Sequence, residues 1–79
     1  MPRFFFDIND GRNEPDEEGF ECADLQTAVL HAKQALPDIA ADEVPRDGER
    51  QAFTVLVSNE DGESVYLAAI TYTGTWLKR

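Results

Sequence analysis

The chain has 79 residues and a formal net charge of -9, so its size and charge exclude several classes of protein at once. A chain of this length makes one domain, here residues 1–79, and such a domain buries only about 60% of its unfolded surface. Binding to duplex nucleic acid or to an anionic membrane selects for clustered Lys and Arg. With 7 basic and 16 acidic residues and no basic run, the chain is expected to bind neither.

The cysteine content predicts a reducing compartment. Cys22 stands alone and cannot form an internal disulfide, whereas a secreted domain of this size usually needs several. No apolar run approaches the roughly 20 residues of a membrane span, and the run from Phe4 to Phe6 is too short for a signal peptide. We therefore expect a cytoplasmic protein.

The first expected strand covers residues 3–9, because apolar and polar side chains alternate there at period two. Its inward positions are Phe4, Phe6 and Ile8. Phe5 is placed on the opposite face. The sequence Asn9-Asp10-Gly11 then favours a tight turn, since these residue types tolerate positive φ.

The next segment, 12–19, is polar, contains Pro15 and is interpreted as an exposed loop. Phe20 and Cys22 alternate with Glu21 directly after it. This alternation is enough for a short second strand, antiparallel to the first, that places Cys22 in the core beside Phe20.

The one expected helix covers Asp24 to Ala41, where apolar residues recur at helical spacing. They form a stripe wide enough to lie on a sheet: Leu25, Ala28, Val29, Ala32, Leu36 and Ile39. Asp24 is the predicted N-cap, because its carboxylate can accept from amides of the first turn. Pro37 costs about 3 kcal/mol inside a helix, so we expect a kink or two abutting helices there. Leu30 lies nearly opposite the stripe and should be exposed.

The end of this helix is predicted from Glu43, which would point into the core if the helix continued. The helix should therefore loosen near Asp42. Val44-Pro45 is then expected to be extended and to enter a turn at Arg46-Asp47-Gly48.

The C-terminal third predicts a hairpin, because Ala52 to Ser58 and Ser64 to Thr73 are rich in β-branched and aromatic residues. Two registers compete. A two-residue turn at Asp61-Gly62 pairs Val57 with Tyr66, Val55 with Ala68 and Phe53 with Ile70. A three-residue turn at 60–62 with a bulge would instead direct Val65, Leu67 and Ala69 to the core.

We adopt the first register, because it leaves Tyr66 and Tyr72 at the ends of the ladder, where their hydroxyl groups can reach water. Gly74 and Trp76 are expected to close the edge of the core. The predicted fold is then α+β, in the order β-β-α-β-β: a two-layer arrangement of a four-stranded antiparallel sheet with one kinked helix on one face.

Four stretches together resemble a known family: the opening Met1 to Phe6, the loop Pro15 to Gly19, the segment Leu36 to Ala40, and the end from Asp61-Gly62 to Trp76. On these stretches the chain resembles an uncharacterised family of short bacterial proteins classed as a domain of unknown function. Its members tend to carry His where this chain has Asp7, and Arg or another polar residue where it has Leu67. The resemblance implies that position 67 faces solvent, and it implies no reaction, substrate or partner.

Several residue groups could carry chemistry, and each is better explained as structure. Counting Asp7 as the first ligand of a calcium loop places Asn9 third and Glu18 twelfth. Gly11 and Arg12 then occupy the fifth and sixth places, where an oxygen donor and a glycine are needed. We therefore interpret the acidic loop, which also holds Asp16 and Glu17, as a solvated turn.

His31 has no second His or Cys at ligand spacing and is expected at the surface or its boundary. Cys22 is expected to be a buried, unreactive thiol, since the sequence offers no base to activate it. The Phe4 to Phe6 triplet could stack on bases, but only Arg3 is near to hold a phosphate. We assign no catalytic, cofactor-binding or metal-binding residue and expect no cofactor.

The remaining unexplained feature is apolar surface. The strand assignments leave one face of the sheet without a helix, and its apolar residues are the candidate interface: Phe5, Leu56, Val65, Leu67 and Ala69. We therefore expect a small non-catalytic interaction or regulatory module that forms a homo-oligomer or binds another protein. Three alternatives stay open: a small-molecule-binding domain or enzyme, an acidic mimic of nucleic acid, and a monomer whose segment around Trp76 folds over the patch.

Overall fold

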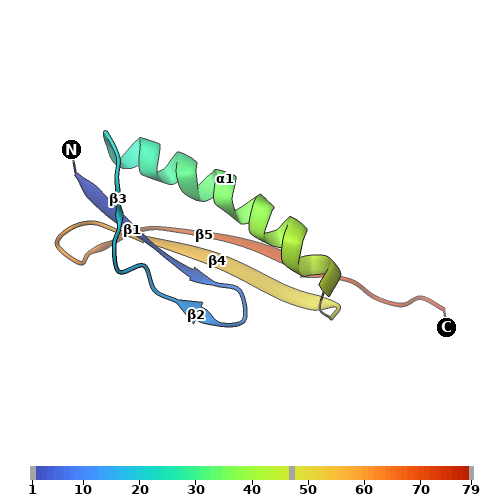
Figure 1. Ribbon diagram of the computed structural model, residues 1–79. Helices are drawn as coiled ribbons and strands as arrows, with labels where there is room; N and C mark the ends of the chain where they lie inside the picture. The colour runs from blue at the N-terminus through green and yellow to red at the C-terminus, as the bar shows by residue number, and fades with distance from the viewer. Residues whose placement is uncertain (1, 47, 79) are drawn as a thin grey trace.

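The computed structural model describes residues 2–46 and 48–78 and contains one long helix and an antiparallel sheet (Figure 1). The α+β class predicted from the sequence is confirmed. In chain order the elements are β1 (Arg3–Asn9), β2 (Asn13–Glu14), β3 (Phe20–Glu21), α1 (Leu25–Glu43), the 3-10 helix η1 (Val44–Arg46), β4 (Arg50–Ser58) and β5 (Ser64–Thr73). The predicted order β-β-α-β-β lacked β2, which lies in the segment expected to be entirely loop.

The sheet has the order β2-β1-β4-β5, and β3 also pairs with β1. β1 is an interior strand of the sheet. β4 pairs along one side of it, and the two short strands β2 and β3 pair along the other side. β3 pairs with the start of β1, where Phe4 lies opposite Phe20, and β2 pairs with its end, where Ile8 lies opposite Glu14. The expected antiparallel pairing around Phe20 is therefore confirmed. All strand pairs are antiparallel.

The N-terminus of α1 is capped as its sequence predicts. Asp24 has extended backbone (φ -160°), and its Oδ1 accepts from the amide and the hydroxyl of Thr27, both at 2.8 Å. These two hydrogen bonds lower the pKa of Asp24, because they favour the charged carboxylate.

The C-terminal half of α1 differs from the prediction. The helix runs without interruption through Pro37 to Glu43, so two abutting helices and a loosening at Asp42 are both wrong. The carbonyl that loses its helical partner is that of Lys33, and Lys33 and Pro37 both lie on the exposed side of the helix, where water can replace the lost hydrogen bond. The expected extended conformation at Val44-Pro45 is also wrong. Val44 is helical (φ -56°, ψ -46°) and its amide donates to the Ala40 carbonyl, which continues the chain into η1. Of the turn expected at 46–48, residue 47 lies outside the described residues.

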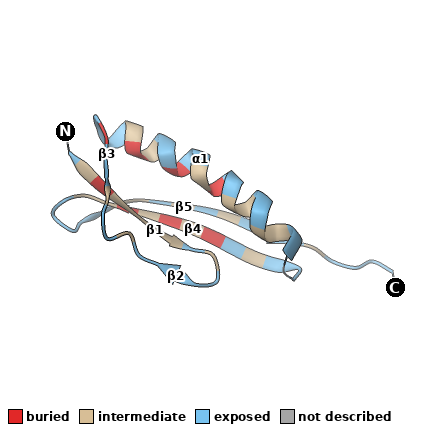
Figure 2. Cartoon of the chain, viewed as in Figure 1, coloured by how far each residue is buried: buried red, intermediate tan, exposed pale blue. Residues whose placement is uncertain are grey.

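The core lies between α1 and the sheet face formed by β1 and β4 (Figure 2). Its buried residues are Phe4, Cys22, Ala28, Ala32, Leu36, Phe53, Val55 and Val57. Ala28 and Ala32 are completely buried, so the helix lies close to the sheet along this line. Leu25, which was expected in the stripe, is 42% exposed because it begins the helix at one side of that line. Leu30 is 53% exposed, as predicted.

The hairpin has the predicted register but not the predicted turn. Phe53 lies opposite Ile70, Val55 opposite Ala68 and Val57 opposite Tyr66. The Asn59 amide donates to the Glu63 carbonyl at 2.9 Å, and the Gly62 amide donates to the Asn59 carbonyl at 3.1 Å, so residues 60–62 form a three-residue turn. A β-bulge between positions 57 and 58 absorbs the extra residue and restores the register. The register predicted for a two-residue turn therefore occurs together with a three-residue turn and a bulge, although the sequence predicts them as alternatives.

The C-terminal segment does not close the core, contrary to the prediction. After β5 the chain runs away from the sheet (Figure 1), and Trp76 and Leu77 are 65% and 94% exposed. Among the described residues, the last backbone hydrogen bond to the rest of the fold is that of the Gly74 amide, which donates to the Glu49 carbonyl at 2.7 Å. Because Trp76 is largely exposed, the monomer in which this segment folds over the other sheet face is not the observed arrangement.

Candidate interaction face

The side of the sheet opposite α1 carries an apolar cluster at its centre. In β4, Val55 and Val57 point toward α1, so Leu56 between them points to the opposite side. The register places Leu67 of β5 directly opposite Leu56. Such directly opposed side chains are the closest cross-strand neighbours in an antiparallel pair.

Four of the five predicted interface residues lie on this side. We call them the open face: Phe5, Leu56, Leu67 and Ala69. Leu67 is 64% exposed, Ala69 is exposed, and Phe5 and Leu56 are half-buried. The fifth residue, Val65, was expected here but packs against the buried core, because the bulge displaces it from the strict alternation of β5.

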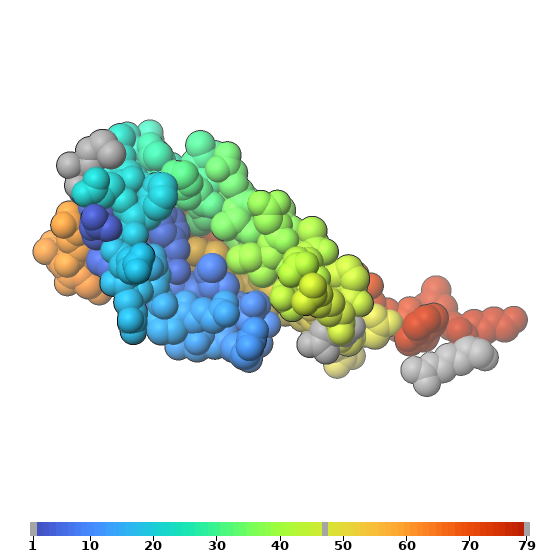
Figure 3. Space-filling view, viewed as in Figure 1, coloured from blue at the N-terminus to red at the C-terminus, as the bar shows by residue number. Residues whose placement is uncertain are grey.

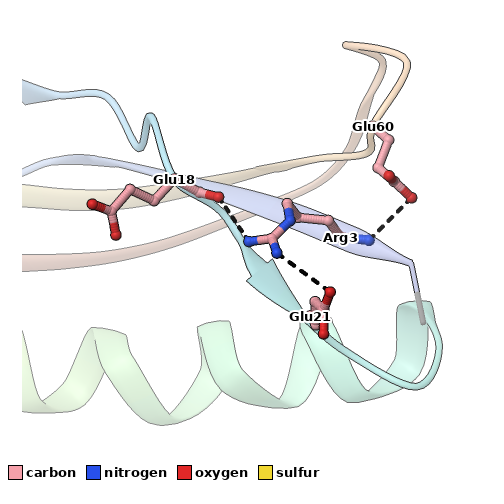
Figure 4. Close-up of polar contacts among 4 residues, drawn as sticks. All are labelled: Arg3, Glu18, Glu21 and Glu60. Carbon is pink, nitrogen blue, oxygen red and sulfur yellow. Dashed lines mark hydrogen bonds and ion pairs between the residues drawn. The ribbon is translucent and has the colours of Figure 1, made fainter.

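Arg3 fixes the border of the open face (Figure 4). Its guanidinium donates to the Glu18 carbonyl at 2.9 Å and to Glu21 Oε1 at 3.3 Å, and its amide donates to Glu60 Oε1 at 3.1 Å. These contacts tie β1 to the loop before β3, to β3 itself and to the β4–β5 turn. The guanidinium is therefore already bonded and is poorly placed to hold a phosphate beside the Phe4 to Phe6 triplet.

Gly19 brings the same loop against Phe5. Its φ is +75°, and a Cβ at this position would lie 2.8 Å from both Arg3 Cγ and Phe5 Cε2. Only glycine fits both the backbone conformation and the space. The close approach explains why Phe5 is half-buried although no helix lies over it.

The acidic loop is tied to β1 by its carboxylates. Asp16 Oδ2 accepts from the Phe6 amide at 3.1 Å, and Asp16 Oδ1 accepts from the Gly19 amide at 3.0 Å and the Glu18 amide at 3.2 Å. Asp7 Oδ1 accepts from the Asp16 amide at 2.9 Å. Phe6 pairs with Val57 of β4 on one side, but on the other side of β1 it lies between the pairs with β3 and with β2 and has no strand partner. The Asp16 carboxylate therefore takes the place of a neighbouring strand's carbonyl.

The environment of Asp16 keeps it ionised. Partial burial by itself raises the pKa of Asp16, but the amides of Gly19, Phe6 and Glu18, together with the positive charge of Arg3, outweigh burial and lower the pKa below the ordinary value. In residues 2–46 and 48–78, no group of three or more His, Cys, Asp or Glu side chains is placed to hold a metal ion.

When the chain is compared with known protein families, its residues 3–71 match the model of a domain of unknown function, DUF6894. The chain belongs to this family. The match runs from β1 into β5 and leaves out the segment with Trp76. A search of curated proteins and a search of solved structures each found no match. The DUF6894 match therefore supports the predicted family without adding a chemical role for any residue.

Two further candidates from the sequence have structural positions in this DUF6894 domain. Cys22 is a free cysteine, 2% exposed, and burial, with a smaller contribution from the Asp24 carboxylate, raises the pKa of its thiol. Phe20, expected beside it in the core, is instead 51% exposed, since β3 pairs at the edge of the sheet. His31 is exposed, as expected, and its ring lies edge-on to Phe20 at a centroid distance of 4.9 Å.

A second apolar surface was missed by the sequence reasoning. At the start of α1, a shallow hollow of about 430 Å³ is lined by Leu25, Gln26, Val29, Leu30 and Lys33. The signal was present, since positions 25, 29 and 30 lie on one side of a helix once Leu25 is taken out of the core stripe. Within the described ranges, no helix is long and apolar enough to cross a membrane.

Proposed function

We propose that this DUF6894 domain is a small, non-catalytic, cytoplasmic interaction module that forms a homodimer through its open face. One observation carries the proposal: Leu67, 64% exposed, lies opposite Leu56 at the centre of a sheet face over which the described chain places no helix and no tail. A leucine pair in this position loses water-exposed apolar area only if another molecule covers it.

A second copy of the chain is the partner that fits this face. The face is a sheet surface, and two such surfaces pack on each other through interdigitated side chains. A twofold axis near Leu67 would place the same four residues on both sides. Within the part of the chain that the structure describes, the core has eight buried apolar residues, and a domain with so thin a core gains stability from a partner.

The surface chemistry does not favour the alternative functions. The four residues of the open face are all apolar, whereas a small-molecule site also needs convergent polar groups to fix its ligand. The register places Asp7 opposite Leu56 on the same side, and the Asp7 carboxylate already accepts from the Asp16 amide. Arg3 is bonded to Glu18 and Glu21, and the net charge is -9, which opposes contact with nucleic acid or an anionic membrane. An acidic mimic of nucleic acid fits the charge, but the charge alone supports it.

The outer edge of β5 is a second place where two copies could join. β5 is the last strand of the sheet, and its segment Ser64–Thr73 contains no charged residue and no proline. Long edges without charges are prone to pair with another strand. This mode would extend the sheet and leave the Leu67 side chain outside the contact.

The test is the mass in solution, measured by light scattering after size exclusion. The wild-type chain should have twice its 8.9 kDa monomer mass. Leu67→Lys should give a folded monomer, because an ammonium group cannot be desolvated in an apolar interface without a partner. Leu30→Lys, the matched control on the helix, should remain a dimer.

The outcomes separate the two modes of association. A wild-type mass of 8.9 kDa removes the homodimer. If the Leu67→Lys variant is still a dimer, the open face is not the dimer interface, and pairing of two copies through the β5 edge is favoured instead. Each copy carries a charge of -9, so the dimer fraction should rise as added salt screens the repulsion.

A further inference from the structure

A cleft lies between α1 and the β1 edge of the sheet, on the opposite side from Leu67. Its volume is about 260 Å³, and it is lined by Phe6, Ile8, Asp16, Gly19, Phe20, His31, Ala35 and Val55. Val55 is 1% exposed and so belongs to the buried floor, whereas Phe20 is 51% exposed and belongs to the rim. Figure 3 shows a hollow between the green of α1 and the blue of the β1 and loop segments.

Three aromatic rings gather around this cleft. His31 lies 4.9 Å from Phe20 and 6.5 Å from Phe6, measured between ring centroids, and both pairs are edge-to-face with interplanar angles of 62° and 76°. All three residues line the cleft, so their rings form part of its walls. Phe20 is not part of the hydrophobic core, and about half of its surface is exposed at the rim of the cleft.

Asp16 supplies the one carboxylate among the residues that line the cleft. Its oxygens accept from the amides of Phe6, Glu18 and Gly19, and a carboxylate has about four acceptor sites, so its capacity is not exhausted. Arg3, the cation that acts on Asp16, does not line the cleft, and its guanidinium is bonded to Glu21 and to the Glu18 carbonyl.

We propose that this cleft binds a small organic cation, namely a methylated ammonium head group such as that of choline. Aromatic rings attract a cation through the negative charge of their faces, and a nearby carboxylate adds a direct ionic attraction. The walls are otherwise apolar and offer few acceptors for N–H groups. A methylated ammonium suits such walls, because it has no N–H groups that lose hydrogen bonds to water on entry.

Size and charge narrow the ligand further. Sites for drug-sized molecules usually measure about 300 to 1,000 Å³, so a cleft of about 260 Å³ suits a head group and not a nucleotide. The chain's charge of -9 attracts cations and repels anions over the whole surface. The proposal is independent of the homodimer, since the cleft and Leu67 lie on opposite sides of the sheet.

The test is a titration of the isotope-labelled chain with choline chloride, followed by amide chemical shifts at mildly alkaline pH and constant ionic strength. Choline should cause saturable shifts at Phe6, Gly19 and His31. The uncharged analogue 3,3-dimethylbutan-1-ol has the same shape but lacks the cation. Its affinity should therefore be at least about tenfold lower than that of choline.

Two variants locate the site. Phe20→Leu keeps an apolar side chain at an exposed position and should weaken choline binding about three- to tenfold through loss of the ring. Leu30→Ala, on the same helix as His31 but outside the cleft, should bind like wild type. The proposal is overturned if choline gives no saturable shift, if the uncharged analogue binds equally well, or if Phe20→Leu leaves the affinity unchanged.

Discussion

The two faces of the sheet are built from the same strands and carry similar apolar side chains, yet they have opposite surroundings. On one face, Val55 and Val57 are at most 1% exposed beneath α1. On the other face, Leu67 is 64% exposed, although it lies directly opposite Leu56, the β4 residue between those two valines. One helix can cover only one face of a sheet. The covered face therefore holds the fold together, and the open face has apolar surface left for a partner.

The largest effect is expected on the covered face. Leu36 is 3% exposed and packs in the core, so Leu36→Ala should lower the free energy of unfolding by about 2 to 5 kcal/mol. Leu30→Ala, the control on the exposed side of α1, should change it by less than about 1 kcal/mol. Urea denaturation of both variants measures this difference. Equal losses would mean that the helix is oriented differently.

Asp16 ties the loop to the edge of β1, between the two faces. Asp16→Asn turns an amide group toward at least one backbone N–H, so it should cost about 1 to 3 kcal/mol at neutral pH. The fold lowers the pKa of Asp16 from its ordinary 3.8, so the carboxylate stabilises the fold above that pH and stops doing so as the pH falls through the lower value of the folded state. Denaturation across this range should show the difference from wild type vanishing at acid pH; a pH-independent difference would contradict the assignment.

The effect of the contact between Gly19 and Phe5 can be measured by comparing the same substitution at Gly19 and at Gly62, which have similar backbone conformations. Gly19 and Gly62 have φ of +75° and +81°, but only at Gly19 does an added Cβ meet Arg3 and Phe5 at 2.8 Å. Gly19→Ala should therefore be less stable than Gly62→Ala by about 1 kcal/mol or more, through overpacking. Thermal unfolding of both proteins compares them, and equal melting temperatures would show that the loop does not press on Phe5.

The smallest effect on folding is expected at the centre of the open face. At a concentration low enough to give monomers, Leu67→Lys should change the free energy of unfolding by less than about 0.5 kcal/mol, because the side chain is exposed. Urea denaturation of dilute samples measures this value. A loss comparable to that of Leu36→Ala would place Leu67 in the core and remove the contrast between the faces.

Periodicity in the sequence predicted the parts of the fold that depend on apolar patterns. The helix, its Asp24 cap and the pairing of Phe53 with Ile70 all follow from such patterns and are confirmed. The turn was wrong, because a β-bulge lets a three-residue turn coexist with the register chosen for a two-residue one. The helix end was wrong because Val44 keeps helical backbone despite the proline that follows it.

The features that sequence reasoning missed depend on contacts distant in the chain. β2 is two polar residues, Asn13–Glu14, and has no alternation to detect. The role of Asp16 follows from its bonds to Phe6 and Gly19, which no spacing rule predicts. The cleft combines Phe6, Phe20 and His31 from three elements. Only the fold brings them together.

The homodimer is tested most directly by whether the open faces of two copies touch. A mixture of ¹³C-labelled and unlabelled chains allows nuclear Overhauser effects between copies to be observed selectively. If the open faces touch, such effects are expected between the methyl groups of Leu56 and Leu67 and the open face of the other copy. Effects between copies that arise instead from Leu25 and Leu30 of α1, with none from Leu67, would contradict it.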